Sequence, residues 1–143
     1  MRKVLDLFSG TGSATRAFQE SSNWEVTLVD IEEDFEADIH ADILDLEPED
    51  FSQDFDLVWA SPPCTKFSVA AIGHHWEKLG EVYLPEKKSC VEAVRLVYHT
   101  LYLIQGLSPD YWFLENPRGM LRSLIGMPQG TVTYCQYGDD RMK

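Results

Sequence analysis

A buried strand that runs directly into two closely spaced glycines constrains the fold of this chain more than any other feature. The sequence DLFSGTGS occupies residues 6–13, within and after an apolar run that begins at Val4. Gly10 and Gly12 have no Cβ, so the backbone can turn sharply there and approach a ligand closely. The strand, the glycine turn and the helix expected after it predict a nucleotide-type ligand, without identifying which one.

Strand-like and helix-like segments alternate along the rest of the chain. The predicted strands cover residues 4–8, 24–29, 39–43, 55–60, 111–114 and 131–137, and the predicted helices cover residues 13–20, 85–106 and 120–125. Residues 65–84 are polar and contain glycine, so we expect a long irregular loop there. Pro85 fits the first turn of the long helix and Gly106 its end. The alternation predicts one α/β domain over residues 1–143, with a mostly parallel sheet flanked by helices.

The charge distribution and the cysteine content indicate where nucleic-acid contacts and which cellular compartment are expected. The net charge of −12 counts against nucleic-acid binding by the surface as a whole. However, no Lys or Arg occurs between Gln19 and Cys64, whereas residues 66–143 hold nine basic and eight acidic side chains, so basic contacts are expected in the second half. Three cysteines without CxxC spacing favour a reducing compartment. With neither a long apolar run nor an apolar leader, we expect a cytoplasmic protein without a membrane span.

Acidic residues stand at or just after the ends of the predicted strands. The third glycine of a GxGxxG fingerprint is replaced by Thr15, so a dinucleotide such as NAD is disfavoured. Asp30 follows the second strand, where a carboxylate can accept hydrogen bonds from ribose hydroxyls, and Asp42 could do the same for an adenine amino group. Each acid taken singly could equally be a helix cap. Together with the glycine turn they favour a nucleoside ligand without a pyrophosphate.

The stretch SPPC, residues 61–64, closes the strand predicted at residues 55–60. Its two prolines stiffen the turn and hold the Cys64 thiol at the end of the strand, a position that suits a nucleophile. Glu115, in LENPRG after the neighbouring strand, offers a carboxyl group that can carry a proton to a substrate. A cysteine after a strand is more often a small core residue, so the interpretation depends on Glu115 lying opposite.

Four blocks carry a family resemblance. DLFSGTGS, SPPCTKFS, ENPRG and YGDDRMK occur in the order and at the approximate spacings typical of the cytosine-5 DNA methyltransferases, which the chain resembles over nearly its whole length. Methyltransferases that act on amino groups resemble it in the first block, but they have an aromatic residue where this chain has Cys64. The resemblance implies a Rossmann-like class I methyltransferase fold, a three-layer sandwich, with S-adenosylmethionine as cofactor. It also implies DNA with a flipped cytosine as substrate.

The resemblance also implies a role for each matched residue. Cys64 would add to C6 of cytosine, Glu115 would hydrogen-bond N3 and the exocyclic amine, and Arg141 would hold O2. The cofactor would contact Asp6, Phe8, Ser9, Gly10, Thr11, Gly12, Asp30, Ile31, Asp42, Ile43 and Pro62, with Asp30 on the ribose and Asp42 and Ile43 at the adenine. The DNA would contact Pro63, Lys66, Ser68 and Asn116, although Asn116 could instead brace its turn.

The predicted loop at residues 65–84 matches the family's mobile active-site loop. Lys66 and Lys78 would be available for phosphates, and Trp76 for stacking or insertion. His74 and His75 are adjacent, so their side chains diverge, and no carboxylate stands at ligand spacing. No metal site is therefore predicted.

Several functions remain open at this point. The chain could be a cytosine-5 methyltransferase acting on DNA or on RNA, an amino-methyltransferase on the same fold, or a cofactor-binding remnant that acts as an interaction module. Family members continue into a target-recognition domain, so the resemblance implies that a C-terminal part is missing here. Either these residues are a fragment of a longer protein, or a minimal variant relies on a complementing segment or partner protein. The target sequence, the oligomeric state and the activity of the 143 residues alone stay open.

Overall fold

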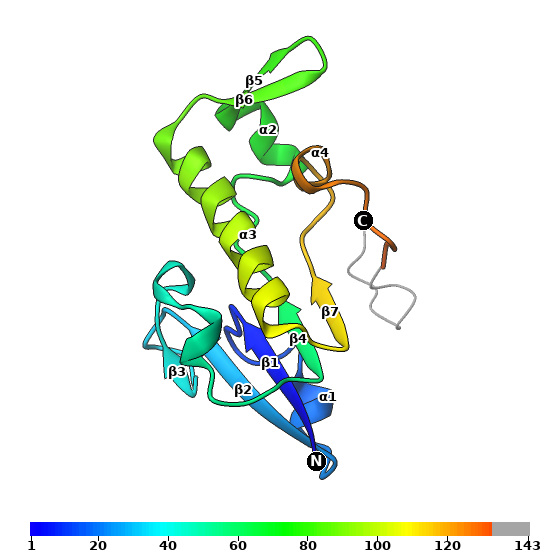
Figure 1. The fold of residues 1–143 in the computed structure, drawn as a ribbon. Helices are drawn as coiled ribbons and strands as arrows, with labels where there is room; N and C mark the ends of the chain where they lie inside the picture. Colours follow the sequence, from blue (N-terminus) through cyan, green and yellow to red (C-terminus); the bar gives the residue numbers. More distant parts are fainter. Residues whose placement is uncertain (133–143) are drawn as a thin grey trace.

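Five parallel strands form the central sheet of the computed structural model, which describes residues 1–132 (Figure 1). In spatial order the strands are β3 (Ile39–His40), β2 (Trp24–Asp30), β1 (Arg2–Leu7), β4 (Leu57–Ala60) and β7 (Tyr111–Leu114). All pairings between these neighbours are parallel. The carboxyl ends of the strands therefore lie along one edge of the sheet, where α/β proteins bind ligands.

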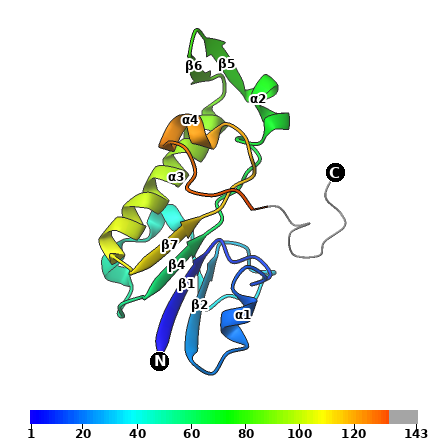
Figure 2. The same cartoon turned by 90° about the vertical axis from the view of Figure 1, so that its right-hand side faces the viewer.

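Helices flank the sheet on both faces. They are α1 (Arg16–Gln19), α2 (Val69–His75), α3 (Lys88–Leu107) and α4 (Leu121–Ile125), with the short 3-10 helices η1 (Ile43–Asp45) and η2 (Pro48–Asp50). α3 lies on one face of the sheet and α1 on the other (Figure 2). This arrangement confirms the predicted α/β sandwich with a parallel sheet. None of the helices among residues 1–132 is long and apolar enough to cross a bilayer.

The larger core fills the space between the sheet and α3. Leu5, Leu7 and Val58 of the central strands are fully buried and form one cluster with Leu103 and Ile104 of α3. Burying side chains of this size stabilises a fold by roughly 1.5–3 kcal/mol each. The core therefore fixes β1 and β4, whose carboxyl ends carry the first two sequence blocks.

A second cluster lies beyond the carboxyl edge of the sheet, between α2, an antiparallel hairpin, the first half of α3 and the start of α4. The hairpin consists of β5 (Trp76–Leu79) and β6 (Val82–Pro85). The buried residues of the cluster are Phe67, Trp76, Cys90, Val97, Met120 and Leu121. The hairpin and α2 consequently stand past the ends of the parallel strands (Figure 1).

The largest departure from the sequence-based expectation is in residues 65–84. The prediction of an irregular loop is wrong, because the segment contains α2 and the β5–β6 hairpin. Gly80, with φ of 64°, makes the tight turn between the two strands. Pro85 ends β6 rather than opening a helix, and α3 begins at Lys88. The short strands on either side of the glycine turn form a hairpin because Trp76 anchors it in the second cluster.

Other element boundaries differ less. The strand predicted at residues 111–114 is confirmed as β7, and β2 extends the predicted strand by one residue. α1 starts at Arg16 rather than residue 13, because residues 13–15 complete the glycine turn. The third predicted strand shrinks to β3, since Asp42 caps η1. Most of the strand predicted at residues 131–137 lies outside the described residues.

Candidate active site

The glycine turn is held in an unusual backbone conformation. Phe8, Gly10 and Gly12 have φ angles of 65°, 52° and 67°. The left-handed region costs a non-glycine residue roughly 1–2 kcal/mol, so Phe8 is strained. Two backbone hydrogen bonds fix the turn, from Ser9 N to Val29 O (3.0 Å) and from Gly12 N to Ser9 O (2.8 Å). Backbone strain of this kind is frequent at functional sites, and no residue pattern around Phe8 predicted it.

Asp30 joins the end of β2 to the glycine turn. Its Oδ2 accepts a hydrogen bond from Gly10 N at 2.8 Å, and its Oδ1 accepts one from Glu32 N at 2.9 Å. The residue is only 8% exposed. Each carboxylate oxygen has two acceptor sites, so Asp30 can organise the turn and still bind a ligand hydroxyl. The sequence predicted the ligand contact and missed the bond to Gly10.

Asp6 lies beneath the same turn and is almost fully buried. Its Oδ2 accepts a hydrogen bond of 2.6 Å from Thr15 Oγ1, whereas its Oδ1 is buried without a partner. Burial, together with the nearby negative charge of Asp30, raises the pKa of Asp6 from 3.8 to about 6, against a lowering by the Thr15 hydrogen bond. Thr15, which interrupts the dinucleotide fingerprint, is thus the partner of a buried acid. Ser9 Oγ is a second buried polar atom of this turn without a partner.

The raised pKa of Asp6 predicts a pH-dependent stability. Because ionisation is less favourable in the folded state, its cost is absent below pH 4 and complete above about pH 6; the pKa change corresponds to roughly 3 kcal/mol. We expect Asp6→Asn to unfold at higher urea concentration than wild type at pH 7.5, with the difference shrinking as the pH falls toward 4. Urea unfolding followed by circular dichroism measures this. A difference that does not vary with pH would contradict it.

The three residues predicted to lie near the adenine end of the cofactor, Ile31, Asp42 and Ile43, occupy different environments. Ile31 is 57% exposed directly after β2. Asp42 Oδ1 accepts a hydrogen bond of 2.9 Å from Leu44 N and so caps η1. The Ile43 side chain is buried in the larger core, which leaves only its backbone for a ligand. Asp42 therefore has the capping role that the sequence left open, and its contact with adenine stays a prediction.

Cys64 and Glu115 lie at the same edge of the sheet. β4 and β7 are adjacent, with Ala60 beside Leu114, and Glu115 N donates a hydrogen bond of 2.8 Å to Ala60 O. Cys64 follows four residues after β4 and is partly buried, so its thiol is not a core residue. The surrounding protein removes part of the water from the Glu115 carboxyl and raises its pKa, which favours the protonated form. A thiol and a carboxyl with a raised pKa thus follow neighbouring strands.

The predicted DNA-contacting residues are spread over the segment after β4 and the turn after β7. Pro63 is exposed and Pro62 buried, while Lys66 and Ser68 are partly buried. Asn116 Nδ2 donates a hydrogen bond of 2.8 Å to Pro62 O, which is the bracing role that the sequence left open. The prediction that Trp76 stacks on DNA is wrong, because its ring is 5% exposed and its Nε1 donates to Lys66 O. Arg141 lies outside the described residues.

Comparison with known proteins identifies the family. The family model described as "C-5 cytosine-specific DNA methylase" matches residues 2–126. The chain belongs to this family. It is 33% identical over 154 residues to "Probable DNA (cytosine-5)-methyltransferase" of Frog virus 3 (isolate Goorha), covering 96% of this chain and 64% of that protein. It is 28% identical over 144 residues to "Type II methyltransferase M.Bsp6I" of Bacillus sp. (strain RFL6), covering 92% and 40%.

A solved structure supports the fold of this C-5 methylase family member. A protein described as a DNA modification methyltransferase encoded within a prophage in E. coli superposes with a TM-score of 0.59 at 19% identity, covering 85% of this chain and 33% of that chain. The chain therefore spans about a third to two thirds of the length of the proteins it matches. The family match includes every predicted site residue except Arg141.

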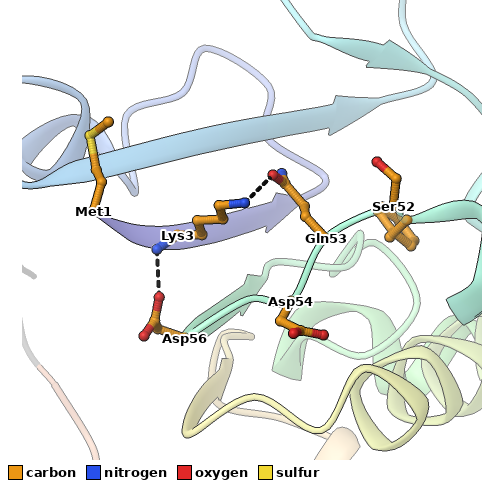
Figure 3. A pocket seen from close by; sticks show the side chains of 7 residues that line it. Met1, Lys3, Ser52, Gln53, Asp54 and Asp56 are labelled. Atoms are coloured by element: carbon orange, nitrogen blue, oxygen red, sulfur yellow. Dashed lines mark hydrogen bonds between the residues drawn. The ribbon is translucent and has the colours of Figure 1, made fainter.

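Other parts of this C-5 methylase family member offer less for catalysis. Among residues 1–132, no three His, Cys, Asp or Glu side chains are grouped to hold a metal ion. An open hollow of about 540 Å³ lies at the amino ends of β1 and β4, the opposite end of the sheet from Cys64 (Figure 3). Lys3 and Asp56 line it, and Lys3 Nζ is hydrogen-bonded to Gln53. The hollow lies away from every predicted site residue.

Proposed function

We propose that this chain is the catalytic part of a DNA cytosine-5 methyltransferase that works through a covalent bond between Cys64 and C6 of cytosine. The observation that carries the proposal is the position of Cys64 and Glu115 after neighbouring parallel strands, β4 and β7, in a chain of this family. An amino-methyltransferase has no use for a thiol at this position. The geometry therefore favours attack on carbon.

The two side chains have complementary tasks. The Cys64 thiolate adds to C6, and the electron pair of the C5–C6 double bond moves toward C5. Glu115 hydrogen-bonds N3 and the exocyclic amine, and its raised pKa keeps a proton available for N3 as charge develops. After methyl transfer, loss of the C5 proton lets the S–C6 bond break, and the thiolate returns to Cys64.

S-adenosylmethionine, when bound, supplies a methyl group on a positively charged sulfur. The glycine turn fits such a ligand, because Ser9 Oγ and Asp6 Oδ1 are buried polar atoms without partners and Gly10 leaves open space where a Cβ would stand. Asp30 would hold the ribose hydroxyls. The remaining turn and adenine residues proposed for the cofactor are Phe8, Thr11, Gly12, Ile31, Asp42, Ile43 and Pro62.

DNA is the proposed partner, with the target cytosine flipped out of the duplex at a cost of a few kcal/mol. Lys66 and Lys78 are proposed phosphate contacts, and Pro63 and Ser68, which lie within four residues of Cys64 in the chain, are further proposed DNA contacts. Lys78 lies on the hairpin, with its Nζ 5.8 Å from the centre of the Tyr83 ring. We propose that Arg141 holds the cytosine O2.

We further propose that residues 1–143 form one catalytic domain in the cytoplasm, completed by another polypeptide segment. Within residues 1–132, β7 is an edge strand, and its side chains Tyr111, Trp112 and Phe113 are 63%, 50% and 49% exposed. Unpaired edges with large apolar side chains are normally covered. This open edge supports the proposal that further polypeptide packs beside β7.

The identity of the methylated atom tests the proposed function. The protein, expressed from its complete reading frame, is incubated with duplex DNA and cofactor carrying a labelled methyl group, and the digested nucleosides are separated by mass spectrometry. We expect the label in 5-methylcytosine. Label in N4-methylcytosine or N6-methyladenine would overturn the proposal in favour of amino-methylation, and label in RNA but not in DNA would reassign the substrate.

A further inference from the structure

The turn after β4 and the turn after β7 are joined at two places. At the first, the side chain of Asn116 reaches across to Pro62 O over 2.8 Å. Asn116 directly follows Glu115, and Pro62 stands two residues before Cys64. A single hydrogen bond thus connects the backbone on either side of the thiol and the carboxyl.

At the second place the backbones themselves meet. Met120 N donates a hydrogen bond of 2.6 Å to Phe67 O, and Ser68 and Gly119 form an antiparallel bridge. A Cβ at position 119 would collide with the carbonyl oxygen of Phe67, so only glycine allows the two turns to lie this close.

The segment between these joins is itself closed. Cys64 O accepts hydrogen bonds from Phe67 N at 2.9 Å and from Ser68 N at 3.0 Å, which tie the cysteine backbone to the second join. Cys64 therefore lies inside a loop fastened at both ends to the turn that carries Glu115. The first join uses only the backbone carbonyl of Pro62, and the second uses no residue proposed to contact the cofactor.

We propose that Asn116 and Gly119 are positioning residues that lock the two turns together and so fix the distance between the Cys64 thiol and the Glu115 carboxyl. This inference rests on the proposed function, because the spacing matters only if both groups act on one base. Misplacing a reacting group by about 1 Å can slow a reaction roughly 100-fold. Because these hydrogen bonds form before the DNA binds, the two groups are already in place and the reaction is not slowed by misplacement.

The chemistry of Asn116 supports this assignment. Its Oδ1 is buried without a partner, an arrangement that costs about 1–3 kcal/mol. An apolar side chain at this position would avoid that cost but would lose the hydrogen bond that Nδ2 donates. The contact that Nδ2 makes is the one to Pro62 O.

Covalent trapping on DNA that contains 5-fluorocytosine tests the lock, because the fluorine at C5 is not lost as a proton is and the Cys64 bond persists. We expect Asn116→Ala and Gly119→Ala to slow trapping at saturating DNA by about 10- to 100-fold, with the cofactor dissociation constant unchanged within about twofold. Asn23→Ala and Gly130→Ala are matched controls, since a Cβ at position 130 meets no atom within 4 Å. Both controls should react at the wild-type rate.

A double-mutant cycle separates positioning from general destabilisation. If Asn116 acts by placing Glu115 relative to Cys64, Asn116→Ala should slow trapping much less in a Glu115→Gln background than in wild type. Equal slowing in both backgrounds, or trapping of both variants at the wild-type rate, would overturn the lock while leaving the proposed function intact. Failure of the wild-type protein to be trapped would overturn the proposed function itself. Should Gly119→Ala not fold, the Asn116 cycle still decides.

Discussion

Cys64→Ala is expected to abolish covalent trapping on 5-fluorocytosine DNA and to lower methyl transfer by on the order of 10⁴-fold or more. The physical reason is that C5 of cytosine is a poor nucleophile until a thiolate adds at C6. The other thiol among the described residues, that of Cys90, is fully buried in the second cluster, and its Sγ donates to His75 O. Trapping is measured as a protein–DNA band that survives denaturation.

Cys90→Ala is the matched control for this experiment. It removes a thiol of the same size, at a cost of about 1 kcal/mol in stability, and should leave trapping at the wild-type rate per folded molecule. Peptide mass spectrometry of the trapped wild-type complex should place the adduct on Cys64. Methyl transfer that persists in Cys64→Ala would contradict a covalent mechanism and favour amino-methylation.

Asp30→Ala is expected to weaken cofactor binding by at least about 100-fold. The substitution removes the acceptor for Gly10 N, so the glycine turn loses its bond to the end of β2, and it removes the proposed ribose acceptor as well. Hydrogen bonds to a charged group contribute about 1.5–3 kcal/mol each, and two of them account for the expected loss. Titration calorimetry with S-adenosylmethionine measures it.

Asp38→Ala distinguishes loss of the site from loss of the fold. Asp38 also accepts a backbone hydrogen bond, from Leu28 N at 2.8 Å, but it is exposed and makes no hydrogen bond to the glycine turn. Asp38→Ala should lower stability slightly and leave the dissociation constant for S-adenosylmethionine unchanged within about threefold. Equal binding by Asp30→Ala and wild type, or tight binding of NADH in place of S-adenosylmethionine, would refute the proposed cofactor site.

Local patterns in the sequence were sufficient for the sheet and for the position of the site. Apolar runs between helical segments predicted the parallel strands, because burial on both faces leaves few polar residues in such strands. Polar residues at strand ends predicted Asp30, Cys64 and Glu115 at one edge, since parallel strands bring their carboxyl ends together. The family resemblance then added roles for individual residues.

The hairpin and the buried Trp76 depended on packing that no local pattern reports. Residues 76–85 alternate too briefly around Gly80 to indicate strands by themselves, and they are held by contacts of Trp76 with Phe67 and the rest of the second cluster. Trp76 was predicted to stack on or insert into DNA because residues 65–84 match the family's mobile active-site loop. Its actual environment comes from residues before and after it in the chain that meet only in three dimensions.

The sequence by itself determined the parallel α/β sheet, the glycine turn and the position of a thiol and a carboxyl after neighbouring strands, because these follow from local periodicity, from the absence of a Cβ and from residue order. Only the tertiary structure decided that Thr15 pairs with buried Asp6, that Asp30 holds Gly10, and that Gly119 lies against Phe67. Each of these is a contact between residues 9 to 52 positions apart. Such pairings are selected by how the whole chain packs, and packing is not encoded in any single segment.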